Sequence, residues 1–264
     1  MLDVIIAGGG PAGLQAALVL GRARRRALLC DSGQPRNTVT GRVHGFLSRD
    51  GIEPAKLRQA AIAELGRYET VELGGQEIIA IESDDGEFAV GLAGGERERT
   101  RKLILATGVI DQLPPIPGLE PLWGKAAFHC PYCDGFELRD QPLAWLDNSS
   151  TASLTAIWLR DWSTEVVLCT NGPSELTDEV RAHLSAAGIP EREQPITGLE
   201  QHGDGARITF SEGASLERRA IFTHPPDSPA LRPRRPARLH NTRGRLDRSK
   251  RPRANEHPRR LRSR

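Results

Sequence analysis

The sequence predicts an α/β fold with two domains, each built around a parallel sheet. Short apolar strands alternate with helical segments in two regions, one beginning at Leu2 and the other near Leu143. A glycine-rich turn follows the first strand, and a proline-rich segment separates the two regions. This alternation is typical of βαβ units, in which a crossover helix joins parallel strands.

The first region opens with such a unit. Residues Leu2–Ala7 are apolar and are closed by glycines, which predicts a buried parallel strand. Residues 10–20 follow as a helix with an Ala/Leu face. The next apolar strand is expected over Ala27–Cys30 and ends at Asp31.

A helix and three strands are expected next. Residues 53–68 place Leu57, Ala61 and Leu65 on one helical stripe. Three strand-like runs with glycine-containing turns between them follow at residues 77–81, 88–92 and 102–106. The simplest arrangement of these runs is an antiparallel meander.

The segment 113–118 (LPPIPG) predicts an extended linker, because each proline fixes its own φ and restricts the residue before it. We therefore expect one domain over residues 1–117 and a second over 118–226. The second is expected to hold strands at Leu143–Leu146, 165–169, 206–210 and Ala220–Thr223, and helices at 150–161 and 174–187.

The chain has a strongly uneven charge distribution. Residues 227–264 contain 13 Arg and 1 Lys against 3 acidic residues, whereas the rest holds 22 basic and 31 acidic residues. The basic segment has no apolar periodicity, so we predict that it is a disordered Arg/Pro-rich tail.

The glycine-rich turn has the spacing of a dinucleotide-binding site. Gly8 allows the tight turn, Gly10 lets the backbone approach a pyrophosphate, and Gly13 lets the helix pack closely on the strand. Asp31 ends the next strand, where a carboxylate can accept hydrogen bonds from ribose hydroxyls. A turn that binds nothing is the alternative, and the strand–turn–helix context favours nucleotide binding.

Cys130 and Cys133, separated by Pro and Tyr, are candidates for a redox-active dithiol. Zinc binding, a structural disulfide and two inert buried cysteines are the alternatives, and we favour the redox role over them. Asp134 follows directly, either as a turn residue or as a proton donor and acceptor for the thiols; the sequence leaves both open.

The other cysteines complete this interpretation. Cys30 and Cys169 stand on predicted buried strands and are expected to be core residues. His129 could add one zinc ligand but would not complete a site, so we expect no metal.

Three segments, residues 8–13, 104–108 and 130–135, together resemble the low-molecular-weight thioredoxin reductases and their relatives among the pyridine nucleotide–disulfide oxidoreductases. Residues 44–47 and 50–51 are similar to the relatives with a Tyr-bearing dithiol. The resemblance extends from residue 1 to about 226. It implies an FAD-binding Rossmann-like three-layer domain with an antiparallel meander, plus a second, smaller Rossmann-like domain.

The resemblance also implies an FAD-dependent disulfide oxidoreductase and assigns roles to residues. Cys133 would face the flavin, Cys130 would exchange with the substrate disulfide, and Asp134 would manage protons. The residues expected to hold FAD are Gly8, Gly10, Ala12, Gly13, Asp31, Asn37, Ala106, Thr107 and Gly108. The implied partner is a thioredoxin-like protein or a small disulfide or dithiol, and the implied assembly is a homodimer.

The second domain departs from the family at its expected NADPH site. Residues 147–152 contain no glycine and begin with Asp147, which would place a negative charge near a phosphate. Residues 170–172 (Thr-Asn-Gly) stand where the family has a basic cluster. We therefore expect the NADPH motif to be degenerate. The alternative function is a dithiol oxidase that passes electrons to oxygen.

The C-terminal region departs as well, because nothing after residue 222 resembles the family's return segment to the first domain. Two interpretations are open: a basic arm for nucleic acid, or an out-of-frame translation that truncates the enzyme. We favour the second and expect no nucleic-acid partner. A truncated, inactive flavin-fold remnant is the corresponding non-enzymatic hypothesis.

The N-terminal apolar run is too short for a signal peptide, and no run reaches membrane-spanning length. Four cysteines do not make a disulfide scaffold. We therefore expect a cytoplasmic protein without a membrane partner.

Overall fold

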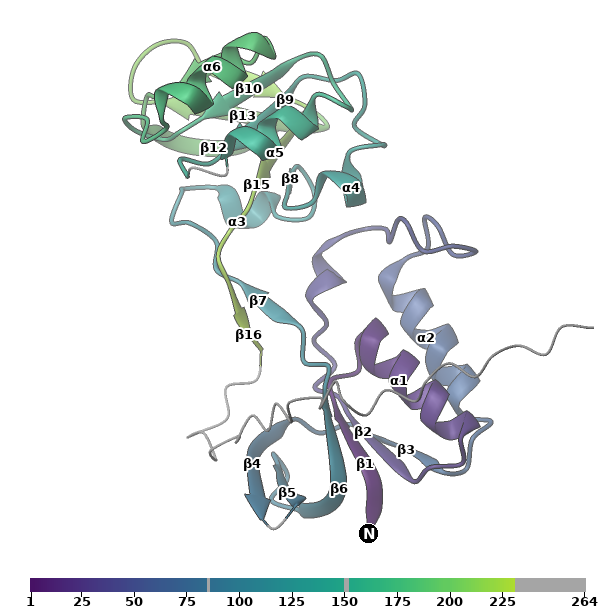
Figure 1. Cartoon of the computed structure of the whole chain (residues 1–264). Helices are drawn as coiled ribbons and strands as arrows, with labels where there is room; N and C mark the ends of the chain where they lie inside the picture. Colours follow the sequence, from purple (N-terminus) through teal and green to yellow (C-terminus); the bar gives the residue numbers. More distant parts are fainter. Residues whose placement is uncertain (85, 150–151, 231–264) are drawn as a thin grey trace, which may run out of the picture.

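The computed structural model describes residues 1–84, 86–149 and 152–230 (Figure 1). Over these residues no helix combines the length and the apolar character needed to cross a membrane.

The first domain is built on a six-stranded sheet with the order β3-β2-β1-β6-β5-β4. Strands β1 (Leu2–Ala7) and β2 (Ala27–Cys30) have the predicted bounds and pair in parallel. On its other side β1 pairs in parallel with β6 (Arg97–Leu105). The strand β3 (Val71–Gly74), which the sequence analysis missed, extends the parallel part beyond β2.

Alternating side chains of β1 separate two cores, because neighbouring residues of a strand point to opposite faces. Val4 and Ile6 pack with residues of α1 (Pro11–Arg22) and α2 (Pro54–Leu65). Ile5 packs on the other face with residues of β4 (Ile78–Asp84) and β5 (Glu87–Leu92). Because β4, β5 and β6 pair antiparallel in sequence order, the predicted three-layer domain with a meander is confirmed.

The second domain repeats this layering around a five-stranded parallel sheet. Its strands, in spatial order, are β11 (Glu191–Arg192), β10 (Val166–Cys169), β9 (Leu143–Leu146), β15 (Ala220–Thr223) and β8 (Ala127–Phe128). Leu143 and Trp145 pack toward α5 (Ala152–Leu159) and α6 (Asp178–Ala186). Ala144 packs on the opposite face, toward the antiparallel sheet of β12 (Ile196–His202), β13 (Gly205–Phe210) and β14 (Leu216–Arg218).

Two short strands run side by side between the domains (Figure 1). β7 (Val109–Asp111) pairs antiparallel with β16 (Asp227–Pro229). The predicted disordered tail therefore needs a correction at its start, because residues 227–229 are held by backbone pairing. The part of that prediction covering residues 231–264 lies outside the described residues.

The linker segment itself packs against the second domain. Ile116 joins a core cluster with Leu119, of α3 (Leu119–Leu122), and Leu199. The boundary between residues 117 and 118 stays a prediction. Likewise, the first two residues of the predicted helix 150–161 fall outside the described chain.

Candidate functional site

The turn from β1 into α1 leaves no room for side chains at two glycines. Gly8 has φ +109°, and a Cβ on it would lie 2.2 Å from the Ala106 carbonyl oxygen. A Cβ on Gly13 would lie 1.8 Å from the carbonyl oxygen of Gly8. Gly10, the N-cap of α1, has no atom within 4 Å of such a Cβ. Gly8 and Gly13 therefore serve close packing, whereas Gly10 presents open backbone.

A cavity of about 1240 Å³ lies over this turn. It is lined by eight of the nine predicted FAD residues: Gly8, Gly10, Ala12, Asp31, Asn37, Ala106, Thr107 and Gly108. Gly13 is not in this lining and contributes through packing. The N-terminal end of α1 faces the cavity, where free N–H groups and the positive end of the helix dipole favour a phosphate.

Asp31 is fixed at the end of β2. Its Oδ1 accepts a hydrogen bond from the Gly33 N–H at 3.0 Å, and its Oδ2 accepts one from Arg58 Nη2. Partial burial acts to raise the pKa of Asp31, but the hydrogen bonds from Arg58, Gly33 and Gly9 outweigh it and lower the pKa. The carboxylate is therefore ionised at neutral pH. An open glycine, a helix N-terminus and a fixed carboxylate together fit the adenosine diphosphate half of FAD.

The dithiol lies where β8 leads into α4 (Pro131–Asp134). Cys130 is the N-cap of this short helix, and the Cys133 N–H donates to its carbonyl oxygen at 3.1 Å. Both thiols are free, with Cys133 exposed and Cys130 half-buried. A hydrogen bond from the Cys133 thiol lowers the pKa of Cys130 to about 6, and the same hydrogen bond raises the pKa of Cys133. Cys130 is therefore the thiolate at neutral pH.

A second cavity, of about 200 Å³, joins the dithiol to the first domain. Cys133 and Asp134 line it from the second domain, and Arg36 and His44 line it from the first. Cys130 is absent from this lining. Five residues line both cavities: Arg36, Asn37, Val39, Asp111 and Trp123. The space over the glycine turn and the space beside Cys133 therefore share walls.

Asp134 directly follows Cys133, and its charge acts to raise the pKa values of both thiols. Burial raises its pKa to about 6; His44 acts to lower this value and Glu137 to raise it. His44 Nδ1 lies 3.5 Å from Glu137 Oε1 and 3.6 Å from Asp50 Oδ2. Asp134 thus titrates near neutral pH, in the range needed to exchange protons with a thiol.

The other two cysteines are core residues, as predicted. Cys30 is 3% exposed and Cys169 is fully buried. Burial raises the pKa of Cys30 to about 11 and that of Cys169 to about 12. In the part of the chain that the structure describes, no group of three or more His, Cys, Asp or Glu side chains is arranged to hold a metal ion.

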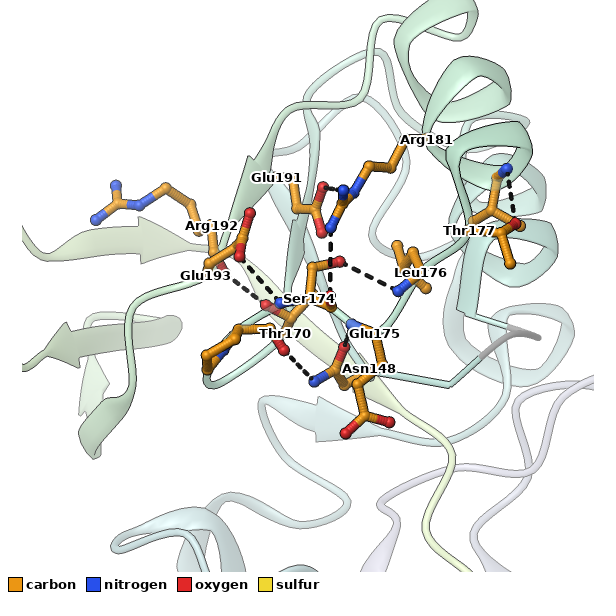
Figure 2. A network of polar contacts seen from close by, with 12 residues as sticks. Asn148, Thr170, Ser174, Glu175, Leu176, Thr177, Arg181, Glu191, Arg192 and Glu193 are labelled. Carbon is orange, nitrogen blue, oxygen red and sulfur yellow. Dashed lines mark hydrogen bonds and ion pairs between the residues drawn. The ribbon is translucent and has the colours of Figure 1, made fainter.

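The edge of the second sheet, where NADPH would be expected to bind, is closed by internal hydrogen bonds (Figure 2). Asn148 Nδ2 donates to the Pro173 carbonyl at 3.0 Å, and its Oδ1 accepts from the Glu175 N–H at 2.9 Å. The Ser174 N–H donates to Glu193 Oε2 at 2.9 Å. These contacts occupy backbone N–H groups of the loop after β10, where the family's basic cluster for the 2′-phosphate would be expected.

The cationic side chains near this edge already have partners. Arg181 Nη2 donates to the Ser174 carbonyl at 3.3 Å, and its Nε lies 3.6 Å from Glu191 Oε2. The Arg192 guanidinium stacks over Phe210 at 4.4 Å. Asp147 holds the Ser149 N–H at 2.8 Å. Among the residues that the structure describes at this edge, Arg181 and Arg192 are thus engaged within the protein and Asp147 is an acid, a set that does not fit the 2′-phosphate of NADPH.

Comparison with known proteins agrees with this geometry. Residues 2–223 match the family described as pyridine nucleotide-disulphide oxidoreductase. The chain belongs to this family. It is 40% identical over 228 residues to thioredoxin reductase aclD of Aspergillus oryzae, with 82% of this chain and 72% of that protein covered.

Solved structures of similar proteins show the same fold. The crystal structure of HlmI matches with a TM-score of 0.80 and 42% identity, covering 86% of this chain and 72% of that chain. An oxidoreductase from Agrobacterium tumefaciens matches with a TM-score of 0.80 and 39% identity, covering 86% and 75%. The predicted fold and family, a thioredoxin reductase-like member of the pyridine nucleotide–disulphide oxidoreductases, are thus confirmed. The chain spans 63–72% of the lengths of three relatives described as thioredoxin reductases.

The sequence analysis did not identify several polar residues at or beside the larger cavity. Arg36 and Asp111 form an ion pair on its wall, and Arg58 binds Asp31 from α2. Arg36 stands beside Asn37 just after a strand end, which is a usual place for ligand-binding residues in parallel sheets. No sequence signal marks Asp111 or Arg58, since their roles depend on partners distant in the chain.

Proposed function

We propose that the chain is an FAD-dependent disulfide oxidoreductase of the thioredoxin reductase-like type, working through Cys130 and Cys133. The observation that carries this proposal is the shared wall between the two cavities, with Cys133 on one and the glycine turn on the other. Bound FAD would supply a two-electron carrier for the dithiol. The residues proposed to hold it are those that line the larger cavity, with Gly13 supporting the turn.

The thiols divide the exchange chemistry between them. The Cys130 thiolate attacks a substrate disulfide, forms a mixed disulfide and releases one substrate thiolate. Cys133 then attacks the Cys130 sulfur, so that the Cys130–Cys133 disulfide forms and the second substrate thiolate leaves. Asp134 takes the proton from the Cys133 thiol, whose raised pKa keeps it protonated, and passes it to a departing thiolate.

The substrate is proposed to be a thioredoxin-like protein or a small disulfide or dithiol. Relatives of the chain carry the name thioredoxin reductase. Next to the thiols, Tyr132 is 73% exposed and Phe136 is 64% exposed. Exposed aromatic side chains beside Cys130 would contact an apolar surface around a substrate disulfide.

The test is anaerobic reconstitution of the full chain with FAD, followed by titration with dithiothreitol or reduced thioredoxin. The expected result is stoichiometric FAD binding and loss of the oxidised-flavin absorbance. A chain that binds no FAD, or that binds FAD without response to dithiol, would contradict the proposal.

A second candidate function is a dithiol oxidase, which the closed edge of the second sheet favours. In this reaction a dithiol loses two electrons and two protons, forms a disulfide, and reduces oxygen to hydrogen peroxide. The test compares oxygen uptake with a reduced dithiol against NADPH consumption with a disulfide. Uptake with dithiol and no NADPH consumption supports the oxidase; NADPH consumption with disulfide rejects it.

We further propose a cytoplasmic location, supported by the free thiols, and a homodimer, supported by the family resemblance. The domain division at residue 117 is also proposed. Sedimentation of the full chain tests the assembly, and limited proteolysis tests the division.

A further inference from the structure

The loop that precedes α2 forms a closed backbone turn around His44. The Val43 N–H donates to the Ile52 carbonyl at 2.8 Å, and the Gly51 N–H donates to the Val43 carbonyl at 2.9 Å. The Asp50 carboxylate accepts a backbone N–H of the same turn at 2.8 Å. These hydrogen bonds close the turn on itself, so they fix the place from which His44 meets the second domain.

His44 contacts carboxylates from both domains. Its Nδ1 lies 3.6 Å from Asp50 Oδ2, in the same turn, and 3.5 Å from Oε1 of Glu137, which follows the dithiol helix α4. The imidazole is mostly buried, and it lines the cavity that Cys133 and Asp134 also line. An imidazole that carries a proton attracts both carboxylates. The contact with Glu137 therefore joins the turn to the segment that carries the dithiol.

The two domains share no apolar core among the residues that the structure describes. Each of the four buried apolar clusters lies wholly within residues 2–106 or wholly within residues 113–222. Packing does occur beside the second cavity, where a Cβ on Gly124 would lie 2.5 Å from the Val39 carbonyl oxygen. Domains move relative to each other unless a large apolar interface joins them. The place of Cys133 beside the first domain thus depends on individual contacts such as that of His44.

We propose that His44 is a positioning residue that holds α4 against the first domain, a role that rests on the proposed function of the dithiol. Protonated His44 bridges Asp50 and Glu137, and this docked arrangement keeps Cys133 on the cavity wall. Partly exposed ion pairs change an equilibrium by about 1.4–5-fold, so the contact biases docking without locking it. The competing explanation is local: His44 packs beside Gly51 and shapes only its own turn.

The test counts docked and open molecules of the ligand-free full chain by single-molecule fluorescence energy transfer. Dyes are attached at Glu69→Cys and Ser185→Cys, two exposed positions on different domains, in a chain that also carries Cys130→Ser and Cys133→Ser. The two remaining cysteines are buried and take no dye. His44→Gln is expected to raise the ratio of open to docked molecules about 2–5-fold, because the charge of the imidazole is lost.

Reversing the charge gives a sharper comparison. His44→Glu places a further carboxylate beside Glu137 and should raise the ratio about 3–30-fold, since repulsion replaces attraction. Adding Glu137→Lys restores opposite charges and should return the ratio to within about threefold of the parent, and His44→Lys alone should stay within about twofold. His202→Glu is the matched control, because His202 pairs with Glu217 at 3.1 Å inside the second domain; a change below about twofold is expected.

A second measurement separates docking from chemistry. In the FAD-loaded chain with its native thiols, the rate of flavin reduction by dithiothreitol should follow the docked fraction across the His44 variants, while the dissociation constant of FAD stays within about twofold. Slower flavin reduction at an unchanged docked fraction would overturn the positioning role. A parent chain that binds no FAD contradicts the proposed function, while the dye measurement on the ligand-free chain still tests His44.

Three results of the dye measurement would also overturn the proposal. They are domains that stay equally docked in His44→Gln and His44→Glu, an equal change in His202→Glu, and a His44→Glu chain that Glu137→Lys does not restore. Melting temperatures identify variants that do not fold. If His44→Glu is one of them, the contrast between His44→Gln, which opens, and His44→Lys, which stays docked, decides.

Discussion

Arg36 binds Asp111 through two hydrogen bonds, from Nε to Oδ2 at 2.9 Å and from Nη2 to Oδ1. The pair joins the 3-10 turn η1 (Arg36–Val39) of the first domain to β7, the strand that leaves it. Asp227 of β16 lies opposite Asp111 in the antiparallel pair that β16 forms with β7. The Arg36 side chain thus holds β7 beside the cavity that Cys133 lines, and β16 is held to β7 by backbone pairing.

Replacing Asp111 is expected to loosen this anchor. Asp111→Asn removes the charge from a carboxylate that is 10% exposed and leaves Arg36 weakly paired. The free energy of unfolding should fall by about 1.5–3 kcal/mol, as for other hydrogen bonds to charged groups. Urea denaturation measures it. Glu82→Gln is the control, since Glu82 pairs with Arg97 at the surface and should cost less than about 1 kcal/mol; equal losses would contradict the anchoring role.

The Cys133 thiol is expected to set the reactivity of Cys130. Alkylation of Cys130 should reach half its maximal rate near pH 6, because its pKa is about 6. Cys133→Ala removes the donor and should move this midpoint upward, toward the value of about 8.5 typical of free cysteine. Mass spectrometry of iodoacetamide-treated peptides gives the midpoints, and Cys133→Ser, which keeps a donor, should shift less. An unmoved midpoint in Cys133→Ala would show that the thiolate has another source of stabilisation.

Replacing Cys130 and replacing Cys133 are expected to abolish different steps of the reaction. Cys133→Ser removes the sulfur beside the cofactor cavity, so dithiol should no longer bleach bound flavin. Cys130→Ser keeps the Cys133 sulfur beside the cavity but removes the thiolate that attacks the substrate disulfide, so FAD binding should persist while turnover stops. Anaerobic spectra and a turnover assay separate the two, and identical behaviour of both variants would reject the division of roles.

Asp134 is expected to lower stability at neutral pH. Its folded pKa, about 6, lies above the ordinary 3.8, so its favourable contribution is complete below about pH 4 and disappears as the pH rises through 6. Asp134→Asn mimics the protonated form and should stabilise the protein by about 1–2 kcal/mol at pH 7.5, allowing for solvent screening, while slowing turnover. Urea denaturation at pH 5 and 7.5 measures this; an equal effect at both pH values would rule out titration as the cause.

Substitution of Gly13 is expected to reduce the stability of the folded protein, whereas substitution of Gly10 is expected to weaken FAD binding. Gly13→Ala places a Cβ 1.8 Å from a carbonyl oxygen and should destabilise the folded protein by roughly 2–4 kcal/mol. Gly10→Ala meets no protein atom within 4 Å, so its stability should change little while FAD binding weakens. Melting temperatures of the ligand-free variants and FAD titrations measure the two effects. If Gly10→Ala bound FAD as tightly as the parent, close approach at Gly10 would be excluded.

Elements with uniform apolar character could be predicted from the sequence, and the others could not. β1, β2, β9 and β15 are short apolar runs buried on both faces, and their predicted positions hold. β6 begins at Arg97 rather than near residue 102, because its first half carries charged side chains that pair across to β4 and β5. β12 is mostly exposed and polar, so its sequence has no apolar pattern that predicts a strand, and the strand is recognised only by its pairing with β13.

The candidate site divides in the same way. The glycines, Asp31 and the cysteines have local spacing that reports their chemistry. Arg36 and Asp111 are 75 residues apart, and the pairing of Arg58 with Asp31 depends on how α2 packs. Local sequence carries no trace of such pairs, because their geometry is produced only when the layers assemble.

The pairing of β7 with β16 places the two ends of the second domain next to each other. A unit with adjacent ends can be exchanged for another without moving the flanking strands apart. For protein engineering, the β7–β16 pair therefore marks the place at which the second domain could be exchanged as a unit. Other dithiol-bearing domains could be joined there, and the Arg36–Asp111 pair would hold each at the same position relative to the glycine turn.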